Sequence, residues 1–183
     1  MALHRAGNTN ESAAMLFPLI GTPMQKKFKP DLMQWLAEYG IEQKQFDNAV
    51  RAAAILAETA PDGAWKQAGL GLQGRASFAK GDNAGAEKAY QAALDTKART
   101  AFAAEAALRL GEIKMAAGAT KPAGEFFATA ARLATDETQL AVRARAYVGL
   151  GRSSKAANDF AGAARYFMSV AVLYDDETIV PEC

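Results

Sequence analysis

The chain has 183 residues, half of them hydrophobic, and 21 Lys and Arg residues balance 20 Asp and Glu residues. This balance excludes the basic surface that nucleic acid requires. The chain has one cysteine, Cys183, and one histidine, His4. These counts exclude disulfide frameworks, Cys- or His-based metal sites and Ser-His or Cys-His catalysis. No apolar run approaches the roughly 20 residues of a membrane span, so we expect no membrane insertion.

Alanine is unusually abundant, at about a quarter of the residues. Alanine is the best helix former and has the smallest side chain with a Cβ atom. No run of alternating β-branched residues indicates a strand. The composition therefore predicts an all-α protein whose helices pack closely together.

One pattern recurs along the chain from its first residues to its last quarter. A small residue is followed four positions later by a larger apolar residue or an alanine, and three positions after that by another apolar residue. This i, i+4, i+7 spacing marks one face of a helix. The copies lie 36 to 40 residues apart and begin at Ala13, Ala49, Ala86, Ala123 and Ala163.

A second pattern precedes each complete copy. Twelve positions before the anchoring alanine stands a small residue, which predicts a first helix that approaches the second helix closely. We expect the turn between the two helices near Gly40, Gly81, Gly118 or Asn158, in the sequences IEQKQ, KGDNA, AGATK and AANDF, because Gly, Asn and Asp suit a helix end and a following N-cap. The small residues are Ala37, Gly74, Gly111 and Gly151.

The two patterns together predict a single α-α superhelix of about nine to ten stacked helices. Both ends break within a repeat, so we expect the chain to be a fragment of a longer protein. The predicted segments are a partial repeat at 1–23, repeats at about 30–62, 63–99, 100–136 and 137–176, and the start of a further helix at 177–183.

The stretch GLGLQG at 69–74 matches the G-x-G-x-x-G of dinucleotide-binding loops, and Asp95 stands where a ribose-binding acid is expected. That motif has meaning only between a strand and a helix, and the preceding ETAPDGAWKQA is no buried strand. We therefore expect Gly74 to be the small residue of the first helix and predict no cofactor. Gly69 and Gly71 weaken that helix, which suggests that a neighbour or a ligand touches their backbone closely.

The repeat resembles the tetratricopeptide repeat in its long, degenerate bacterial form. The resemblance rests on LRLGEIKMAAGATKPAGEFFATAARL (108–133), AKGDNAGAEKAYQAALD (79–95) and VGLGRSSKAANDFAGAARYF (148–167), and it covers nearly the whole chain. The units exceed the family's usual length of about 34 residues, and Ser77, Lys114 and Ser154 replace its favoured tyrosine. The Sel1-like repeat is a neighbouring alternative, although its glycine-rich signature is missing. The likeness suggests a bacterial parent protein of the periplasm or envelope, while the compartment stays unknown.

The resemblance implies a concave groove lined by the first helices, which would bind a peptide or helix of a protein partner. The basic C-terminal half of this groove favours an acidic or carboxylate-ending peptide. The alternative is that these are ordinary surface residues of amphipathic helices. The groove residues expected from the resemblance are Trp35, Glu38, Arg75, Phe78, Arg109, Glu112, Met115, Arg145, Arg152 and Lys155, with Gln34, Ile41, Leu108 and Val148 on the same helix faces.

Catalysis has little support in the sequence. Glu105 and Glu112 lie seven positions apart on one helix face, and 175–177 form a run of carboxylates. Neither set has a convergent partner for acid–base work. We therefore expect a non-enzymatic interaction scaffold, with a structural spacer or assembly module of a larger protein as the alternative.

Self-association is a further expectation from the sequence. An array end leaves the apolar face of its last helix without a neighbouring repeat. We expect the exposed residues to be Tyr166, Phe167, Val170 and Leu173.

Overall fold

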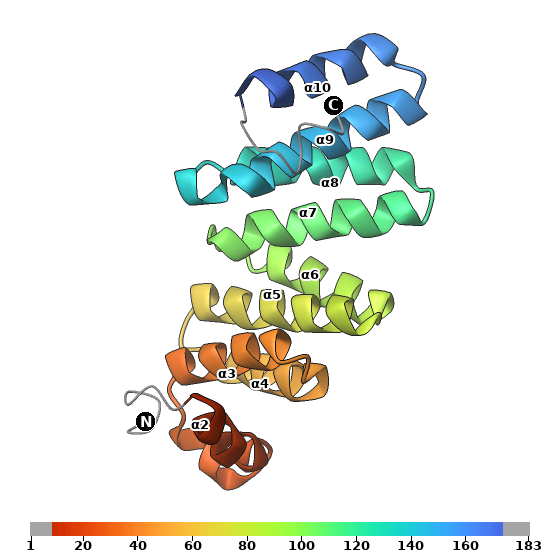
Figure 1. Ribbon diagram of the computed structural model, residues 1–183. Helices are drawn as coiled ribbons and strands as arrows, with labels where there is room; N and C mark the ends of the chain where they lie inside the picture. The colour runs from red at the N-terminus through yellow and green to blue at the C-terminus, as the bar shows by residue number, and fades with distance from the viewer. Residues whose placement is uncertain (1–8, 174–183) are drawn as a thin grey trace. The chain divides into compact units, whose positions relative to one another are not determined.

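The computed structural model describes residues 9–173, and within this range it contains nine α-helices, three short 3₁₀ helices (η) and no strand (Figure 1). The all-α prediction is confirmed. None of these helices has both the length and the apolar character needed to cross a bilayer. The elements are α2 (Thr9–Leu16), η1 (Phe17–Leu19), η2 (Pro23–Lys27), α3 (Pro30–Glu42), α4 (Phe46–Thr59), α5 (Gly63–Lys80), α6 (Asn83–Asp95), α7 (Ala101–Ala116), α8 (Thr120–Leu133), η3 (Glu137–Gln139), α9 (Leu140–Ala156) and α10 (Phe160–Leu173).

The chain forms two compact units, one ending at Lys97 and the other beginning at Ala98. In the first unit α3, α4, α5 and α6 pack each on the next, and α3 also contacts α5. In the second unit α7, α8, α9 and α10 do the same, and α7 also contacts α9. Each unit is therefore a short array of helix pairs in which successive first helices lie side by side. The helix expected at 177–183 lies outside the described residues.

Glycine and an aromatic ring hold the two helices of a pair together. A Cβ atom added to Gly74 of α5 would lie 2.6 Å from the ring of Tyr90 on α6, and one added to Gly111 of α7 would lie 2.6 Å from the ring of Phe127 on α8. Because no real Cβ atom fits at such a distance, the ring occupies the space that glycine leaves. The expected close approach of the two helices is confirmed.

The GLGLQG stretch is packed against protein and lies in the interior of α5. A Cβ atom on Gly69 would come within 2.5 Å of the backbone nitrogen of Ala57 and 2.8 Å of the carbonyl oxygen of Ala53, both on α4. Asp62 is the N-cap of this helix, and its side chain accepts a hydrogen bond from the Trp65 amide. The close neighbour expected at Gly69 is therefore the preceding helix, α4. Within residues 9–173 no strand precedes this stretch, so the strand that the dinucleotide-binding motif requires is missing there.

The turns between paired helices share one backbone conformation. The residue five positions before each anchoring alanine has a positive φ angle, and the amide that follows it donates to the carbonyl five residues earlier at 2.7 to 2.9 Å. This is the Schellman ending of a helix. The positive angles occur at Lys44 (57°), Gly81 (89°), Gly118 (75°) and Asn158 (61°).

The first turn lies within the expected sequence IEQKQ (41–45), with its left-handed residue at Lys44 and not at the preceding glycine. Gly40 belongs to α3, and its carbonyl accepts the hydrogen bond from the Gln45 amide that closes the turn. A Cβ atom on Gly40 would lie 3.0 Å from Cβ of Ala49 on α4, so this glycine serves helix packing. Lys44 takes the left-handed position, which a non-glycine residue adopts only at an energetic cost.

The second helices begin with N-caps of the expected type at two of these turns. The Asp82 carboxylate accepts a hydrogen bond from the Gly85 amide at 2.9 Å, and the Asp159 carboxylate accepts one from the Gly162 amide at 2.8 Å. A Cβ atom at Gly85 would lie 2.2 Å from a carboxylate oxygen of Asp82, and Gly162 stands in the same relation to Asp159. The two Asp-x-x-Gly sequences therefore place a carboxylate directly over the first turn of α6 and of α10.

The end of the second unit differs in part from the sequence expectation. Val170 was expected at the surface, but it is fully buried in a cluster with Ala144 and Val148, because α10 turns this residue toward α9. Tyr166 and Phe167 are partly buried. The side chain of Leu173 lies outside the described residues. The exposed large apolar side chains of α10, among those that the structure describes, are instead Phe160, Met168 and Val172, at 64, 64 and 79% exposure.

Replacing Phe127 with Ala should destabilise the fold by about 3–5 kcal/mol, because this ring fills the space between Gly111 of α7 and Gly149 of α9 and is only 3% exposed. Phe167→Ala should cost less, since that ring is partly exposed. Urea unfolding followed by circular dichroism measures both changes. The exposed Phe160→Ala variant is the control and should change the stability by less than about 0.5 kcal/mol. Equal losses at Phe127 and Phe160 would contradict the packing described.

Lys44→Gly and Gly118→Ala should change stability in opposite directions. Lys44→Gly removes the strain of a non-glycine residue at a positive φ angle and should stabilise the fold by up to about 1 kcal/mol. Gly118→Ala introduces the same strain and should destabilise the fold by about 1 kcal/mol. No atom lies within 4 Å of a Cβ atom added to Gly118, so backbone conformation alone acts there. Gly124→Ala within α8 is the control and should stabilise slightly. Thermal unfolding that shows the same sign at positions 44 and 118 would refute this account.

Candidate binding face

The residues expected in a groove fall on the two units separately. Trp35 and Glu38 lie on α3, Arg75 and Phe78 lie on α5, and all four are partly buried. The remaining six lie on the two first helices of the second unit. We name them the α7–α9 face, which consists of Arg109, Glu112 and Met115 on α7 and Arg145, Arg152 and Lys155 on α9.

Two apolar residues expected on the same faces lie instead in the core. Leu108 is 1% exposed and Val148 is 5% exposed. Leu108 precedes Arg109, so its side chain points about 100° away from that of Arg109 around the helix axis. Val148 packs against Val170 of α10, on the side of α9 that faces its paired helix. The expectation for these two residues is therefore wrong.

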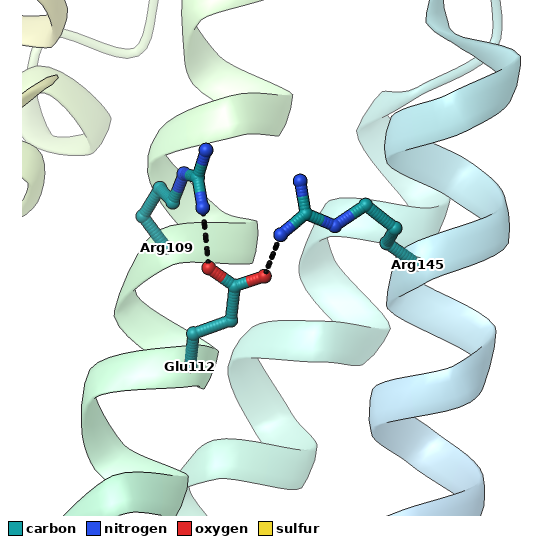
Figure 2. Close-up of polar contacts among 3 residues, drawn as sticks. All are labelled: Arg109, Glu112 and Arg145. Carbon is teal, nitrogen blue, oxygen red and sulfur yellow. Dashed lines mark hydrogen bonds and ion pairs between the residues drawn. The ribbon is translucent and has the colours of Figure 1, made fainter. Parts of the chain in front are cut away.

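Three residues of the α7–α9 face form one ionic cluster (Figure 2). One oxygen of the Glu112 carboxylate accepts a hydrogen bond from Nη1 of Arg109 at 2.8 Å, and the other accepts one from Nη2 of Arg145 at 2.7 Å. Arg109 and Glu112 lie three positions apart on α7, whereas Arg145 reaches across from α9. The carboxylate therefore holds two guanidinium groups from neighbouring helices at fixed positions.

This cluster is partly shielded from water. The side chains of Arg109 and Glu112 are 24 and 26% exposed, and that of Arg145 is 44% exposed. Partial burial strengthens such contacts relative to a fully solvated pair, whose worth is about 0–1 kcal/mol. The Glu112 carboxylate offsets one of the two positive charges, so the three side chains together carry a net charge of plus one. The face is thus less basic than its arginine content suggests.

The sequence indicated only half of this arrangement. Opposite charges three positions apart on a helix meet on the same face, so the Arg109–Glu112 pair has a local signal. Arg145 is 33 residues from Glu112. Its pairing depends on how far α9 is displaced along α7, which no local pattern specifies.

One of the two aromatic residues expected in the groove of the first unit, Trp35, has a packing role. The Trp35 ring lies 5.5 Å from that of Tyr39, and the Tyr39 ring lies 6.3 Å from that of Phe17. The Tyr39 hydroxyl donates a hydrogen bond to the side chain of Asn10 at 2.8 Å. Trp35 therefore belongs to an aromatic cluster that joins α3 to α2 and η1.

The described residues contain no group of three or more His, Cys, Asp or Glu side chains that could hold a metal ion. Glu105 lies on α7 and is partly buried. The carboxylate run at 175–177 lies outside the described residues.

The chain matches no known protein-family model, and no curated protein is similar to it in sequence. The chemistry of its own surface is therefore the basis on which a function is assigned.

The pairing of Glu112 with Arg145 should appear as a coupling free energy of about 0.5–1 kcal/mol in a double-mutant cycle of Glu112→Gln and Arg145→Gln. The coupling should fall as salt is added, because the residues are partly exposed. Arg165→Gln on α10 is the matched control, since Arg165 is an exposed arginine of the same unit without contact to Glu112. Strictly additive effects at positions 112 and 145 would argue against the cluster.

Proposed function

We propose that the chain is a non-enzymatic interaction scaffold that binds an acidic segment of a protein partner on the α7–α9 face. The observation that supports this most directly is the pair of guanidinium groups that Glu112 holds from two neighbouring helices. Binding sites gain affinity when their polar groups are positioned before the ligand arrives, because less entropy is lost on binding. A scaffold of this kind requires no catalytic group.

Arg145 is well suited to contact a partner carboxylate. Only one of its N–H donors is engaged, by Glu112, and its other donors have no acceptor among residues 9–173. A planar guanidinium with several free donors favours carboxylate or phosphate groups, which it can bind in a bidentate manner. The side chain is also exposed enough to reach a ligand.

The rest of the α7–α9 face extends this surface along α9. Arg152 and Lys155 are exposed, and they follow Arg145 at intervals of seven and three residues, which places them on the same side of the helix. The partly buried Met115 on α7 adds a flexible apolar contact. The combination favours a partner segment with several acidic residues and at least one apolar side chain.

We also propose that the chain is a divergent array of the tetratricopeptide type. The support is the repeated contact between the glycine of a first helix and the aromatic ring of a second helix, together with the shared left-handed turn between them. In arrays of stacked helix pairs the first helices present the binding surface. The α7–α9 face is made of such first helices.

The alternative function is a structural spacer or assembly module without a ligand of its own. The observation that favours it is the exposed apolar surface of α10, where Phe160, Met168 and Val172 stand open to solvent. Such a surface suits another helix, either in a second copy of the chain or in a further repeat. Glu112 and its two arginines would then only hold α7 and α9 together.

A peptide-display selection against the whole chain tests the proposal. Selected peptides should be enriched in Asp and Glu, and Arg145→Glu should weaken their binding at least tenfold, because it places a carboxylate opposite the acidic ligand. Arg165→Glu on α10 makes the same change of charge outside the α7–α9 face and should leave the affinity within about twofold.

Two outcomes would contradict this function. Equal losses in the Arg145→Glu and Arg165→Glu variants would mean that only net charge matters. Enrichment of no peptide, together with concentration-dependent self-association that Met168→Glu abolishes in sedimentation velocity, would favour the assembly module instead.

A further inference from the structure

A polar cavity of about 290 Å³ lies in the second unit, apart from the α7–α9 face. It opens to solvent and is lined by the start of α7, the last turn of α8 and the segment that leads through η3 into α9. Arg99 and Arg132 contribute guanidinium groups, and Gln139 contributes a side-chain amide. The Arg109–Glu112–Arg145 cluster lies further along α7 and shares no residue with this lining.

Gln139 indicates that the cavity is suited to a polar ligand. Its side chain is only 8% exposed, yet the amide makes no hydrogen bond to any other part of residues 9–173. Its backbone N–H is separately satisfied by the carbonyl oxygen of Asp136. The nitrogen and oxygen of this amide are not buried away from solvent, so they open onto the cavity. A ligand with a donor or an acceptor can hydrogen-bond to them there.

The charges around the cavity favour an anion. Neither Arg99 nor Arg132 forms an ion pair with a carboxylate of residues 9–173. The N-terminal end of α7, which is the positive end of its helix dipole, also borders the cavity at Ala101.

The lining contains one carboxylate, that of Asp136, which is already engaged. Its Oδ1 atom accepts hydrogen bonds from the Thr138 amide and the Thr138 hydroxyl, each at 2.8 Å. These bonds lower the pKa of Asp136, so the group is ionised at neutral pH. Two arginines and one aspartate leave a net charge of plus one on the lining.

We propose that this cavity binds a small molecule that carries a carboxylate or phosphate group. The anionic group lies between Arg99 and Arg132, and the polar remainder of the molecule hydrogen-bonds to the Gln139 amide. The volume of about 290 Å³ lies just below the usual range of ligand pockets, about 300–1,000 Å³, which suits a compact metabolite better than a dinucleotide. This site does not depend on the peptide-binding function proposed for the α7–α9 face.

The test is an NMR titration of the whole chain with inorganic phosphate, succinate and free phosphoserine at low salt. The side-chain amide signals of Gln139 and the Nε–H signals of Arg99 and Arg132 should shift and saturate with at least one probe. Arg132→Gln should raise the dissociation constant about tenfold, because the variant loses one charge-assisted hydrogen bond to the probe. Arg165→Gln on α10 is the control of equal charge change and should leave binding unaltered.

Gln139→Leu separates binding from folding. The variant should unfold at about the same urea concentration as the wild type, because the Gln139 amide makes no hydrogen bond within residues 9–173 whose loss would destabilise the fold. Its affinity for the probe should nevertheless fall several-fold. Loss of affinity with retained stability supports the site.

Three results would overturn the proposal. The first is a set of shifts that stay linear with probe concentration into the tens of millimolar. The second is saturable binding that Arg132→Gln and Gln139→Leu leave unchanged, or that Arg165→Gln weakens equally. The third is tight binding of a phosphoserine peptide without binding of free phosphoserine, which would identify the anion as a protein side chain.

Discussion

The contact between a glycine on one helix and an aromatic ring on its partner is the feature on which each helix pair depends. Gly111 lets the Phe127 ring lie against the backbone of α7, and Gly74 does the same for Tyr90 on α5. A glycine within a helix costs about 1 kcal/mol relative to alanine, whereas burying a large aromatic side chain contributes about 1.5–3 kcal/mol. The gain from burying the ring exceeds the cost of the glycine only when the ring fills the space that the glycine leaves. A bulkier residue at Gly111 would push α8 away and change the depth at which the next helix packs.

The position of α9 on α7 follows from this packing, and it decides the chemistry of the exposed surface. The Phe127 ring also contacts Gly149 of α9, so one ring sets the spacing of three helices in the second unit. That spacing brings Arg145 to the Glu112 carboxylate. The same unit carries a second group of arginines at the start of α7, where Gln139 and Arg132 surround a cavity. Apolar packing in the interior thus places two separate groups of arginines on this unit, one on the α7–α9 face and one beside the cavity.

Local patterns were sufficient to predict the helix pairs but not every detail of their turns. The small residues at Gly74 and Gly111 and the aromatic residues sixteen positions later signalled the close approach of paired helices. Gly81, Gly118 and Asn158 signalled left-handed turns, because these residue types tolerate a positive φ angle. The first turn lies in the expected stretch 41–45, but its left-handed residue, Lys44, had no such signal, since lysine rarely adopts that conformation. Gly40 is small because Ala49 packs against it.

The sequence by itself determined the helical content, the repeating helix pair and the charged residues available for binding, because these follow from composition and from the spacing of residues along one helix. Only the tertiary structure decided that Glu112 joins Arg109 to Arg145, that Val170 and Leu108 are buried, and that Gln139 lines a cavity. Each of these depends on the rotation and displacement of one helix relative to another. Those quantities arise from the packing of side chains that are distant in the sequence, and the periodicity of a single helix carries no information about them.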